Sequence, residues 1–403
     1  MPERGHFQRV LPLIRGLADR GTPVVVYTAT EFQAATERAG GRFADLFGRF
    51  PLGAADATSR PVPCRYVTFA AHYAEALIQE MVGLRPSVIV YDTFAVIGFL
   101  LGRVLGVPYV NVCAGHGMTP AVALRSLADD RRVAPSEACW RAVEVLRDRW
   151  GIAEAGPFAY FTGVSPYLNV YCEPPEFLNP VGAAAFHPIV YFGSLFPDAR
   201  DASRPSPDPA WDGRDGAAVR VYASFGSVVW RYFAEEAAAA LEAFADAIAA
   251  LAGARALISL GGHGLPAVTR TRLERSNVRV ADYVDQWNVL RDATACLTHN
   301  GLNSTHEMIY HGVPMISYPF FADQPALAAR CQAIGCAVPL VGAVRGAVAA
   351  GDVRAALDRV REEASSMAEA LARARAWELE VIAARPAAIQ RILDLRRGAG
   401  EAA

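Results

Sequence analysis

Short β-branched runs alternate with helical patterns along most of the 403-residue chain. The strands predicted in the first half are Val24–Tyr27, Ser87–Tyr91, Tyr109–Cys113, Leu168–Cys172 and Ile189–Phe192. Those predicted in the second half are Val219–Ser224, Ala256–Leu260, Val278–Ala281, Ala295–Thr298 and Met315–Tyr318. Helical periodicity marks residues 8–20, 31–39, 94–105, 136–149, 234–252, 304–311 and 325–334. This alternation predicts an α/β protein whose parallel sheets are covered by helices on both faces.

A change of composition divides the chain near its middle. Four prolines mix with Asp, Ser and Gly between Phe196 and Gly216, and this stretch predicts a linker between domains. We place one Rossmann-like domain over residues 1–197, the linker over 198–215 and a second Rossmann-like domain over 216–403. Doubly wound sheets bind ligands beyond the carboxyl ends of their strands. We therefore expect the site in a central cleft that both sheets face.

The basic residues exclude two classes of enzyme. All 39 of them are arginine, and an alanine-rich chain without lysine is typical of a GC-rich, bacterial genome. Pyridoxal-phosphate chemistry needs a lysine amine for its Schiff base, and a P-loop needs its own lysine. The formal net charge of −2, with no long basic run, also argues against nucleic acid as a partner.

The cysteines and the apolar segments indicate the cellular compartment of the protein. The seven cysteines form no C-x-x-C pair and predict reduced, buried thiols in the cytoplasm. The first residues show no apolar signal peptide, and no segment reaches the ~18–20 uncharged residues of a spanning helix. No D-x-D motif and no histidine–carboxylate cluster with ligand spacing occurs, so we expect neither a metal nor a bound cofactor.

The stretch from Tyr283 to Gln324 carries the most specific pattern. A predicted strand ends at Thr298, and H-N-G-L-N-S-T-H-E follows at 299–307. Ser304 and Glu307 have the spacing of a capping box, which predicts Ser304 as a helix N-cap. The free N–H groups and the positive dipole end of such a helix attract anions. The alternative is that Glu307 only caps the helix and that the histidine at 299 belongs to the core.

In its wider context this pattern resembles the nucleotide-sugar signature of family 1 glycosyltransferases of the GT-B fold, close to bacterial macrolide and polyketide glycosyltransferases. That signature reads W-x-P-Q, H-x-G-x-x-S-T-x-E, G-V-P and D/E-Q. Here the corresponding segments are 283–286, 299–307, 312–314 and 323–324. The resemblance extends to Gly5-His6, Asp92 and the F-G-S turn at 225–227, and so covers nearly the whole chain. Three residues depart from it: Tyr283 replaces the tryptophan, and Asp285 and Arg9 stand where prolines are expected.

The resemblance implies a diphosphate site in the second domain. His299, with the backbone around Gly301, Asn303 and Ser304, would hold the donor diphosphate. Ser227 would approach the same diphosphate from the first loop of that domain. With these donors and the helix dipole, the leaving group would need no metal.

The resemblance also assigns the nucleoside and the sugar of the donor. Glu307 would accept hydrogen bonds from the ribose hydroxyls, and Gln286 would meet the edge of the base. Tyr283 would stack on the base, with a smaller ring than tryptophan. Asp323 and Gln324 would hydrogen-bond the sugar.

A catalytic pair is implied in the first domain. His6 lies at the start of a helix, where the dipole disfavours the imidazolium and keeps the ring neutral. A neutral ring can take the proton of an acceptor hydroxyl, and Asp92 would fix the tautomer and stabilise the cation that forms. The alternatives are a solvent-exposed terminal histidine and an aspartate that only caps the next helix.

Together these features predict a metal-independent, inverting glycosyltransferase. It would move a sugar from a UDP- or dTDP-sugar to a hydroxyl of an apolar small molecule, such as a polyketide, macrolide or flavonoid-like aglycone. A homodimer is compatible with the sequence. One alternative is a GT-B scaffold that binds nucleotide without transferring sugar. Another is an NAD-dependent oxidoreductase, because G-H-G-L-P-A at 262–267 matches G-x-G-x-x-A and Asp282 follows at the ribose-binding position.

The family resemblance also implies a strand of about six residues just before Gly5-His6, near the middle of the first sheet. Only Met1–Arg4 precede Gly5, and Pro2 in this polar stub cannot supply that strand. We therefore expect the first sheet to lack its first strand. We expect the natural start to lie upstream of Met1; the alternative is that the shorter protein is real and catalytically weak.

Overall fold

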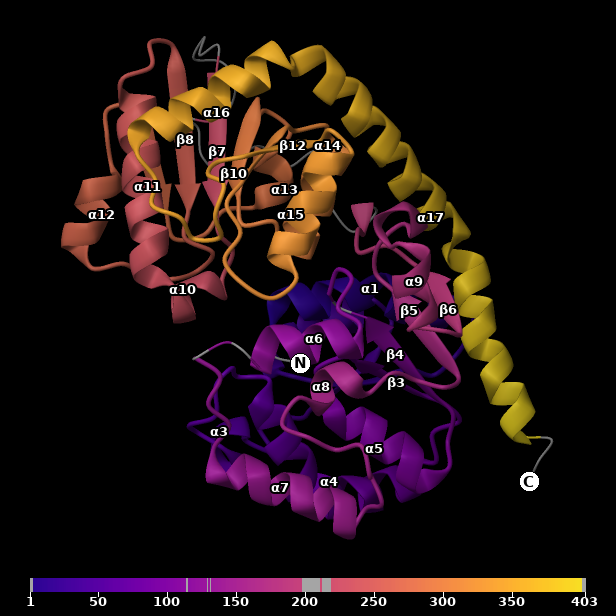
Figure 1. Ribbon diagram of the computed structural model, residues 1–403. Coiled ribbons are helices and arrows are strands. Elements are labelled where there is room, and N and C mark those ends of the chain that lie inside the picture. Colours follow the sequence, from indigo (N-terminus) through magenta and orange to yellow (C-terminus); the bar gives the residue numbers. More distant parts are fainter. Residues whose placement is uncertain are drawn as a thin grey trace. The chain divides into compact units, whose positions relative to one another are not determined.

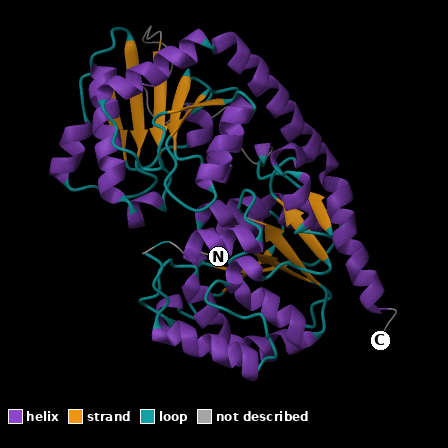
Figure 2. Cartoon of the chain, in the orientation of Figure 1, coloured by secondary structure: helices purple, strands orange, loops and turns teal. Residues whose placement is uncertain are grey.

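The chain folds into two compact units, which are described separately. The N-terminal unit comprises Met1–Phe196 and Glu380–Ala403, and the C-terminal unit comprises Pro197–Leu379. The computed structural model describes residues 3–113, 115–128, 130, 132–197, 211 and 219–400. Each unit is an α/β structure with parallel strands, which confirms the predicted fold class (Figures 1 and 2).

The C-terminal unit is built on one parallel sheet, which has six strands in the residues described. The strands are β7 (Val219–Ser224), β8 (Ala254–Ser259), β9 (Val278–Ala281), β10 (Ala295–Thr298), β11 (Met315–Ser317) and β12 (Ala337–Pro339). Their order is β12-β11-β10-β7-β8-β9, so the chain runs outward from β7 in one direction and outward from β10 in the other. The strand order therefore reverses between β7 and β10, where Ser224 lies beside Thr298.

Helices cover this sheet, and small residues let them pack closely. They are α10 (Val229–Tyr232), α11 (Ala234–Ala249), α12 (Ala267–Leu273), α13 (Gln286–Val289), α14 (Leu302–His311), α15 (Gln324–Ala333), α16 (Ala350–Glu362) and the first part of α17 (Ala364–Gly400). Helix α11 lies beside the sheet in Figure 1. Its side chains Ala237, Leu241 and Phe244 are fully buried. Burial of such apolar faces is the main source of stability for a helix on a sheet.

The N-terminal unit contains two separate parallel sheets among its described residues. One pairs β1 (Val25–Thr28) with β2 (Arg42–Asp45). The other has the order β3-β4-β5-β6, with β3 (Ile89–Asp92), β4 (Tyr109–Cys113), β5 (Leu168–Tyr171) and β6 (Ile189–Tyr191). The sheet of this unit is thus interrupted between β1 and β3, which is where a first strand was expected to be missing.

The helices of this unit vary widely in length. They are α1 (Arg4–Ala18), α2 (Gln33–Arg38), α3 (Leu52–Ala55), α4 (Cys64–Leu84), α5 (Val96–Leu105), α6 (Pro120–Ala128), α7 (Glu137–Asp148), α8 (Ala159–Thr162) and α9 (Pro180–Ala184), with 3-10 turns at Thr30–Phe32 and Pro175–Phe177. One core lies where α4, α5 and α7 pack together beside β3 and β4 (Figure 1). The long helix α4 has no counterpart among the predicted segments.

The C-terminal boundary differs from the predicted one. Residues 380–403 were assigned to the second domain, but they pack with the N-terminal unit. Arg385 on α17 donates a hydrogen bond from Nε to the Phe192 carbonyl at 2.8 Å, and its guanidinium lies 4.8 Å from that ring centre. The Ile389 side chain packs directly on Gly16 of α1. The predicted linker 198–215 lies outside the described residues except Trp211, which is buried and donates to the Val289 carbonyl.

Two further sequence expectations concern thiols and membranes. All seven cysteines are buried and free. Over the described ranges, no helix is both long and apolar enough to cross a bilayer.

Candidate active site

The loop that follows β10 lies at the point where the strand order reverses in the C-terminal unit. His299 comes directly after Thr298, the last residue of β10. The loop after β7, with Gly226 and Ser227, leaves the neighbouring strand at the same level. Ligands of open parallel sheets bind at such a reversal, beyond the carboxyl ends of the strands. The F-G-S turn and the histidine motif, 72 or more positions apart in the sequence, are therefore adjacent in the fold.

The His299 ring is held between two glycines. A Cβ atom on Gly301 would lie 2.3 Å from Nε2 of His299, and one on Gly226 would lie 2.8 Å from the same atom. Gly226 also has a φ of +68°, a conformation that other residues rarely adopt. Both positions thus exclude any side chain, because a larger residue at either one would displace the imidazole.

Burial controls the charge of His299. The side chain is almost fully enclosed, and desolvation lowers its pKa from 6.5 to about 4, against a smaller opposing effect of the Ser224 backbone. The imidazole is therefore neutral at neutral pH. A neutral imidazole N–H can hydrogen-bond an anion without adding a positive charge.

The helix after this loop begins earlier than the sequence suggests. Gly301 is the N-cap of α14 and Leu302 its first residue, so the prediction that Ser304 caps the helix is wrong. Asn300, with a φ of +56°, turns the chain before the helix. Because Ser304 already lies inside the first turn, its hydroxyl does not cap the helix. Asn303 lies in the same turn, whose orphan N–H groups make this helix end suitable for an anion.

A hydrogen-bond network joins α13 to α14. Nε2 of Gln286 donates to Glu307 Oε2 at 2.7 Å and to Ser304 Oγ at 3.2 Å. Glu307 is only 6% exposed, so this contact fixes a nearly buried carboxylate. The amide of Gln286 therefore positions Glu307, and the expected contact of Gln286 with a base stays a prediction.

The other residues predicted to bind the nucleotide-sugar lie in three loops of the same unit. Ser227 is exposed after β7, and Tyr283 is 53% exposed after β9. Asp323 precedes α15 as its N-cap residue. Gln324 is buried, and its Oε1 accepts from the Phe320 N–H at 2.9 Å. The Gln324 carbonyl oxygen therefore holds the loop before α15.

The dinucleotide-like motif at 262–267 has different surroundings. Pro266 precedes α12, which has only seven residues. Asp282, the residue matched to a ribose-binding acid, instead pairs with Arg270, whose guanidinium also donates to the Val280 carbonyl at 2.7 Å. The acid is therefore already engaged in an ion pair that ties α12 to β9.

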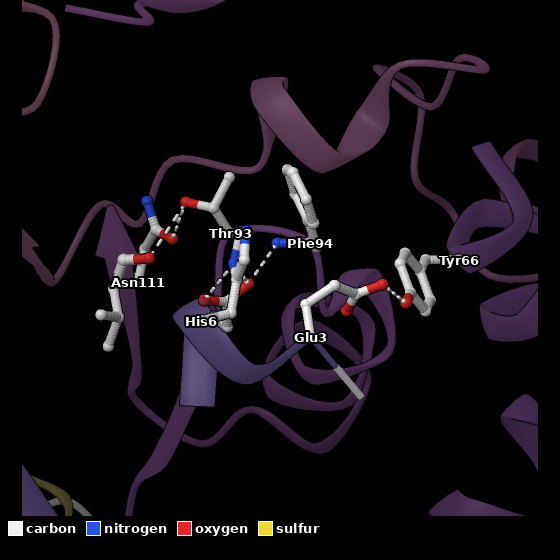
Figure 3. Close-up of polar contacts among 8 residues, drawn as sticks. Glu3, His6, Tyr66, Thr93, Phe94 and Asn111 are labelled. Carbon is white, nitrogen blue, oxygen red and sulfur yellow. Dashed lines mark hydrogen bonds and ion pairs between the residues drawn. The ribbon is translucent and has the colours of Figure 1, made fainter. Parts of the chain in front are cut away.

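In the N-terminal unit the structure brings His6 and Asp92 together. His6 lies in the first turn of α1, and Asp92 ends β3. Nδ1 of His6 lies 2.9 Å from both carboxylate oxygens. Dashed lines at His6 mark these contacts in Figure 3. The Phe94 N–H donates to Oδ1 of Asp92 at 2.9 Å, and the Phe94 ring centre lies 4.3 Å from the His6 ring centre. This geometry orients the imidazole and leaves Nε2 as its acid–base nitrogen.

Asp92 remains charged in this site. Burial raises the pKa of its carboxyl, but the charge and hydrogen bond of His6 and the Phe94 N–H lower it, and the net shift is downward. An ionised Asp92 accepts a hydrogen bond from the Nδ1–H of His6 and so holds the ring in place. The next residue, Thr93, donates to the Val112 carbonyl and so anchors the end of β3 to β4 (Figure 3).

Two buried histidine–carboxylate pairs were missed by the sequence reasoning. Nδ1 of His116 lies 3.0 Å from Oε2 of Glu173, and Nδ1 of His306 pairs with Glu378. Each pair joins residues more than 50 positions apart, so no local motif could reveal it. Among the residues that the structure describes, no group of three or more His, Cys, Asp or Glu side chains could hold a metal ion.

Comparison with known sequences finds similarity mainly in the C-terminal unit. Residues 191–373 match the sequence model of the family described as UDP-glucoronosyl and UDP-glucosyl transferase. UDP-glucuronosyltransferase 2A1 of Rattus norvegicus is 45% identical over 65 residues, which are 16% of this chain and 12% of that protein. The human protein of the same name is 43% identical over a segment of the same length. The match thus covers about an eighth of these curated relatives.

Comparison with solved structures covers the whole chain. The glycotransferase of kitacinnamycin superposes with a TM-score of 0.74, at 22% identity, over 97% of this chain and 96% of that one. Spinosyn rhamnosyltransferase SpnG complexed with thymidine diphosphate gives 0.64 at 22% identity, over 98% of both chains. The same enzyme complexed with spinosyn aglycone gives 0.60. Residues 191–373 of this chain thus match the model of the UDP-glucoronosyl and UDP-glucosyl transferase family, and the chain as a whole has the GT-B fold of the glycosyltransferase structures to which it is similar.

Proposed function

We propose that this protein is an inverting glycosyltransferase that moves a sugar from a UDP- or dTDP-sugar to a hydroxyl of an apolar small molecule. The observation that carries the proposal is the contact between His6 and Asp92. A nucleotide-sugar site alone would bind a donor, whereas transfer requires a base for the acceptor. The family match of the C-terminal unit supports the donor, and the thymidine diphosphate and aglycone complexes of SpnG support the two substrate classes.

In the proposed reaction His6 is the general base. Its Nε2 takes the proton of the acceptor hydroxyl while the oxygen attacks the anomeric carbon from the face opposite the diphosphate. The new carbon–oxygen bond forms as the bond to the phosphate oxygen breaks, and the electron pair leaves with the nucleoside diphosphate. Asp92 stabilises the imidazolium that results. A single displacement of this kind inverts the anomeric configuration.

The groups proposed to bind the diphosphate in the C-terminal unit are neutral hydrogen-bond donors and a helix dipole. The His299 ring and the first N–H groups of α14 would hold the diphosphate, with Ser227 beside them. Glu307 would accept from the ribose hydroxyls in the position that Gln286 gives it. Tyr283 would stack on the base. The hydrogen-bond donors around the diphosphate would stabilise the leaving group without a metal. We therefore expect chelators to leave the activity unchanged.

The test is a donor and acceptor screen read by mass spectrometry. The purified chain is incubated with UDP- and dTDP-sugars and a panel of polyketide, macrolide and flavonoid aglycones. We expect at least one aglycone to gain the mass of one sugar, with an inverted anomeric centre by NMR. The His6→Ala variant is the matched control and should give no product. Hydrolysis or nucleotide binding without any transfer would refute the proposal.

A nucleotide-binding scaffold without transferase activity is the second candidate. It is favoured by the interruption of the sheet between β1 and β3, because β3 carries Asp92 and the first turn of α1 carries His6. This candidate predicts calorimetric binding of UDP or dTDP together with an empty product screen. The seven buried free cysteines support our further proposal that the protein works in the reducing cytoplasm.

A further inference from the structure

The loop that follows β8 repeats the turn that follows β7. In each, a serine ends the strand and a glycine stands two positions later: Ser224 and Gly226 in one loop, Ser259 and Gly261 in the other. The glycine N–H donates to the serine Oγ, at 3.3 and 3.4 Å, and both glycines have a positive φ, +68° and +63°. Ser224 and Ser259 are partners in the neighbouring strands β7 and β8 (Figure 1), so the two turns leave the sheet side by side.

The two turns are also in direct contact. A Cβ atom on Gly261 would lie 2.5 Å from the Gly226 carbonyl oxygen and 3.0 Å from the Ser227 nitrogen. No side chain fits at Gly261, because the obstacle is backbone. The loop after β8 therefore packs against the loop in which Ser227 is proposed to meet the donor diphosphate.

On its other side the same loop is tied to the loop after β9. The Gly262 N–H donates to the Asp282 carbonyl at 2.7 Å. Tyr283, the residue proposed to stack on the base, follows Asp282 directly. The segment 261–263 thus lies between the loops that carry Ser227 and Tyr283, at the carboxyl edge of the strands, where open parallel sheets bind ligands.

The side chain of His263, in this segment, is held by a tryptophan. Its ring lies nearly parallel to the Trp230 indole, with 5.7 Å between the ring centres and 6° between the planes. Trp230 is only 2% exposed and follows Ser227 by three residues, so a buried surface next to the proposed diphosphate loop fixes the imidazole. The imidazole is half-buried and makes no hydrogen bond or ion pair with any residue that the structure describes.

The chemistry of this position suits a phosphate group. Both ring nitrogens of His263 remain for a ligand, and an imidazole donates a hydrogen bond in either charge state. The Asp282 carboxylate does not compete for the ring, because it pairs with Arg270. His299 supplies only a neutral ring to the same diphosphate, since burial lowers its pKa to about 4. A second imidazole would therefore add a hydrogen-bond donor that the site can use.

We infer that His263 is a further donor-binding residue, which hydrogen-bonds the diphosphate of the nucleotide donor from the β8 side of the Ser227 loop. His299 lies on the β10 side of that loop, because the strand order is β10-β7-β8. Trp230 is a positioning residue that orients the His263 ring. The glycine-rich segment 262–267 then serves a nucleoside diphosphate instead of a dinucleotide. The inference rests on the proposed donor site and adds to it a contact from the loop after β8.

The test compares the affinities of the full chain for UDP, UMP and uridine by calorimetry. The three probes share one nucleoside and differ by one phosphate group at each step. His263→Ala should weaken UDP binding by at least about tenfold and leave uridine binding unchanged, because the lost hydrogen bond is to a charged phosphate. His263→Gln keeps a hydrogen-bond donor and should recover part of the loss. Val268→Ala, at a position of α12 that is 68% exposed, is the matched control and should change none of the affinities.

NMR of the histidine rings distinguishes contact with the ligand from a merely structural role. In the chain with isotope-labelled histidines, the resonance that is missing from the His263→Gln spectrum belongs to His263. We expect this resonance to shift with UDP and with inorganic pyrophosphate, and not with uridine. Trp230→Phe keeps an aromatic ring with a smaller stacking surface, so the shift that UDP induces should be smaller in that variant.

Three results would overturn the inference. They are an unchanged UDP affinity of His263→Ala, an equal loss of UDP and uridine affinity in that variant, and a His263 resonance that stays in place at saturating UDP. In each of these cases the wild-type chain still binds UDP, and the proposed function stands or falls on the product screen alone. A wild-type chain that binds neither UDP nor dTDP would instead overturn the donor site and this inference together.

Discussion

Substituting Gly301 by alanine tests whether the close packing of the His299 loop is needed for donor binding. The added methyl group would lie 2.3 Å from Nε2 and 2.8 Å from Cε1 of His299. These positions are about 1 Å inside ordinary contact. Gly301 has a φ of −66°, which alanine adopts freely, so the expected effect is a clash and not a backbone strain.

The imidazole has little room to move away. A methyl group at Gly226 would also collide with it, which shows that the ring touches backbone on that side too. Overpacking of a filled site costs about 1–3 kcal/mol. Because the obstacle is a buried ring and backbone, we expect Gly301→Ala to lower the free energy of unfolding by about 2–3 kcal/mol. A displaced His299 should also weaken UDP or dTDP binding by at least about tenfold.

Urea unfolding and calorimetry measure the two effects. Gly264→Ala is the matched control, because a methyl group there meets nothing within 4 Å, and it should change stability by less than about 0.5 kcal/mol. The decisive measurement is a double-mutant cycle. In a His299→Ala background the cost of Gly301→Ala should fall below about 0.5 kcal/mol, because the clash has been removed. An undiminished cost in that background would show that the reasoning about the imidazole is wrong.

Three further predictions concern single side chains. His6→Ala should abolish sugar transfer and leave nucleotide affinity unchanged. Asp92→Asn should also lower the transfer rate severely, but by less than His6→Ala. Full activity of His6→Ala in the mass-spectrometric assay would show that His6 is not the base. Glu307→Ala should weaken nucleoside diphosphate binding by about 1–3 kcal/mol in calorimetry, whereas a purely structural Glu307 predicts lost stability with unchanged affinity. His299 stays neutral in the folded chain down to about pH 4, while the unfolded imidazole takes a proton below about 6.5. Stability should therefore fall by about 3 kcal/mol as the pH drops through this window, and equal pH slopes for wild type and His299→Gln would contradict this.

Local sequence determined the strands that carry the proposed donor site. The strands β7, β9 and β10 begin and end at the predicted residues, because each is a β-branched or apolar run bounded by polar or turn-forming residues. The glycines of the histidine motif were also recognisable from the sequence. Their steric reason, the His299 ring between Gly226 and Gly301, appears only when two distant loops are adjacent.

Other features could not be determined locally. Ser304 has the spacing of an N-cap, but Asn300 turns the chain and Gly301, three residues earlier, is the N-cap of α14. The serine therefore lies inside the first turn. The segment 380–403 looks like any amphipathic helix, and only its contacts through Arg385 and Ile389 place it on the N-terminal unit.

By itself the sequence determined the α/β class, the two-domain organisation and the motif at 299–307, because periodicity and turn chemistry are properties of neighbouring residues. It named His6 and Asp92 only through a resemblance. The structure decided that these two groups, 86 positions apart, are in contact, and that β1 and β3 belong to separate sheets among the described residues. Both facts depend on how strands that are distant in sequence are ordered in a sheet, and that order is set by tertiary packing, which no local pattern records.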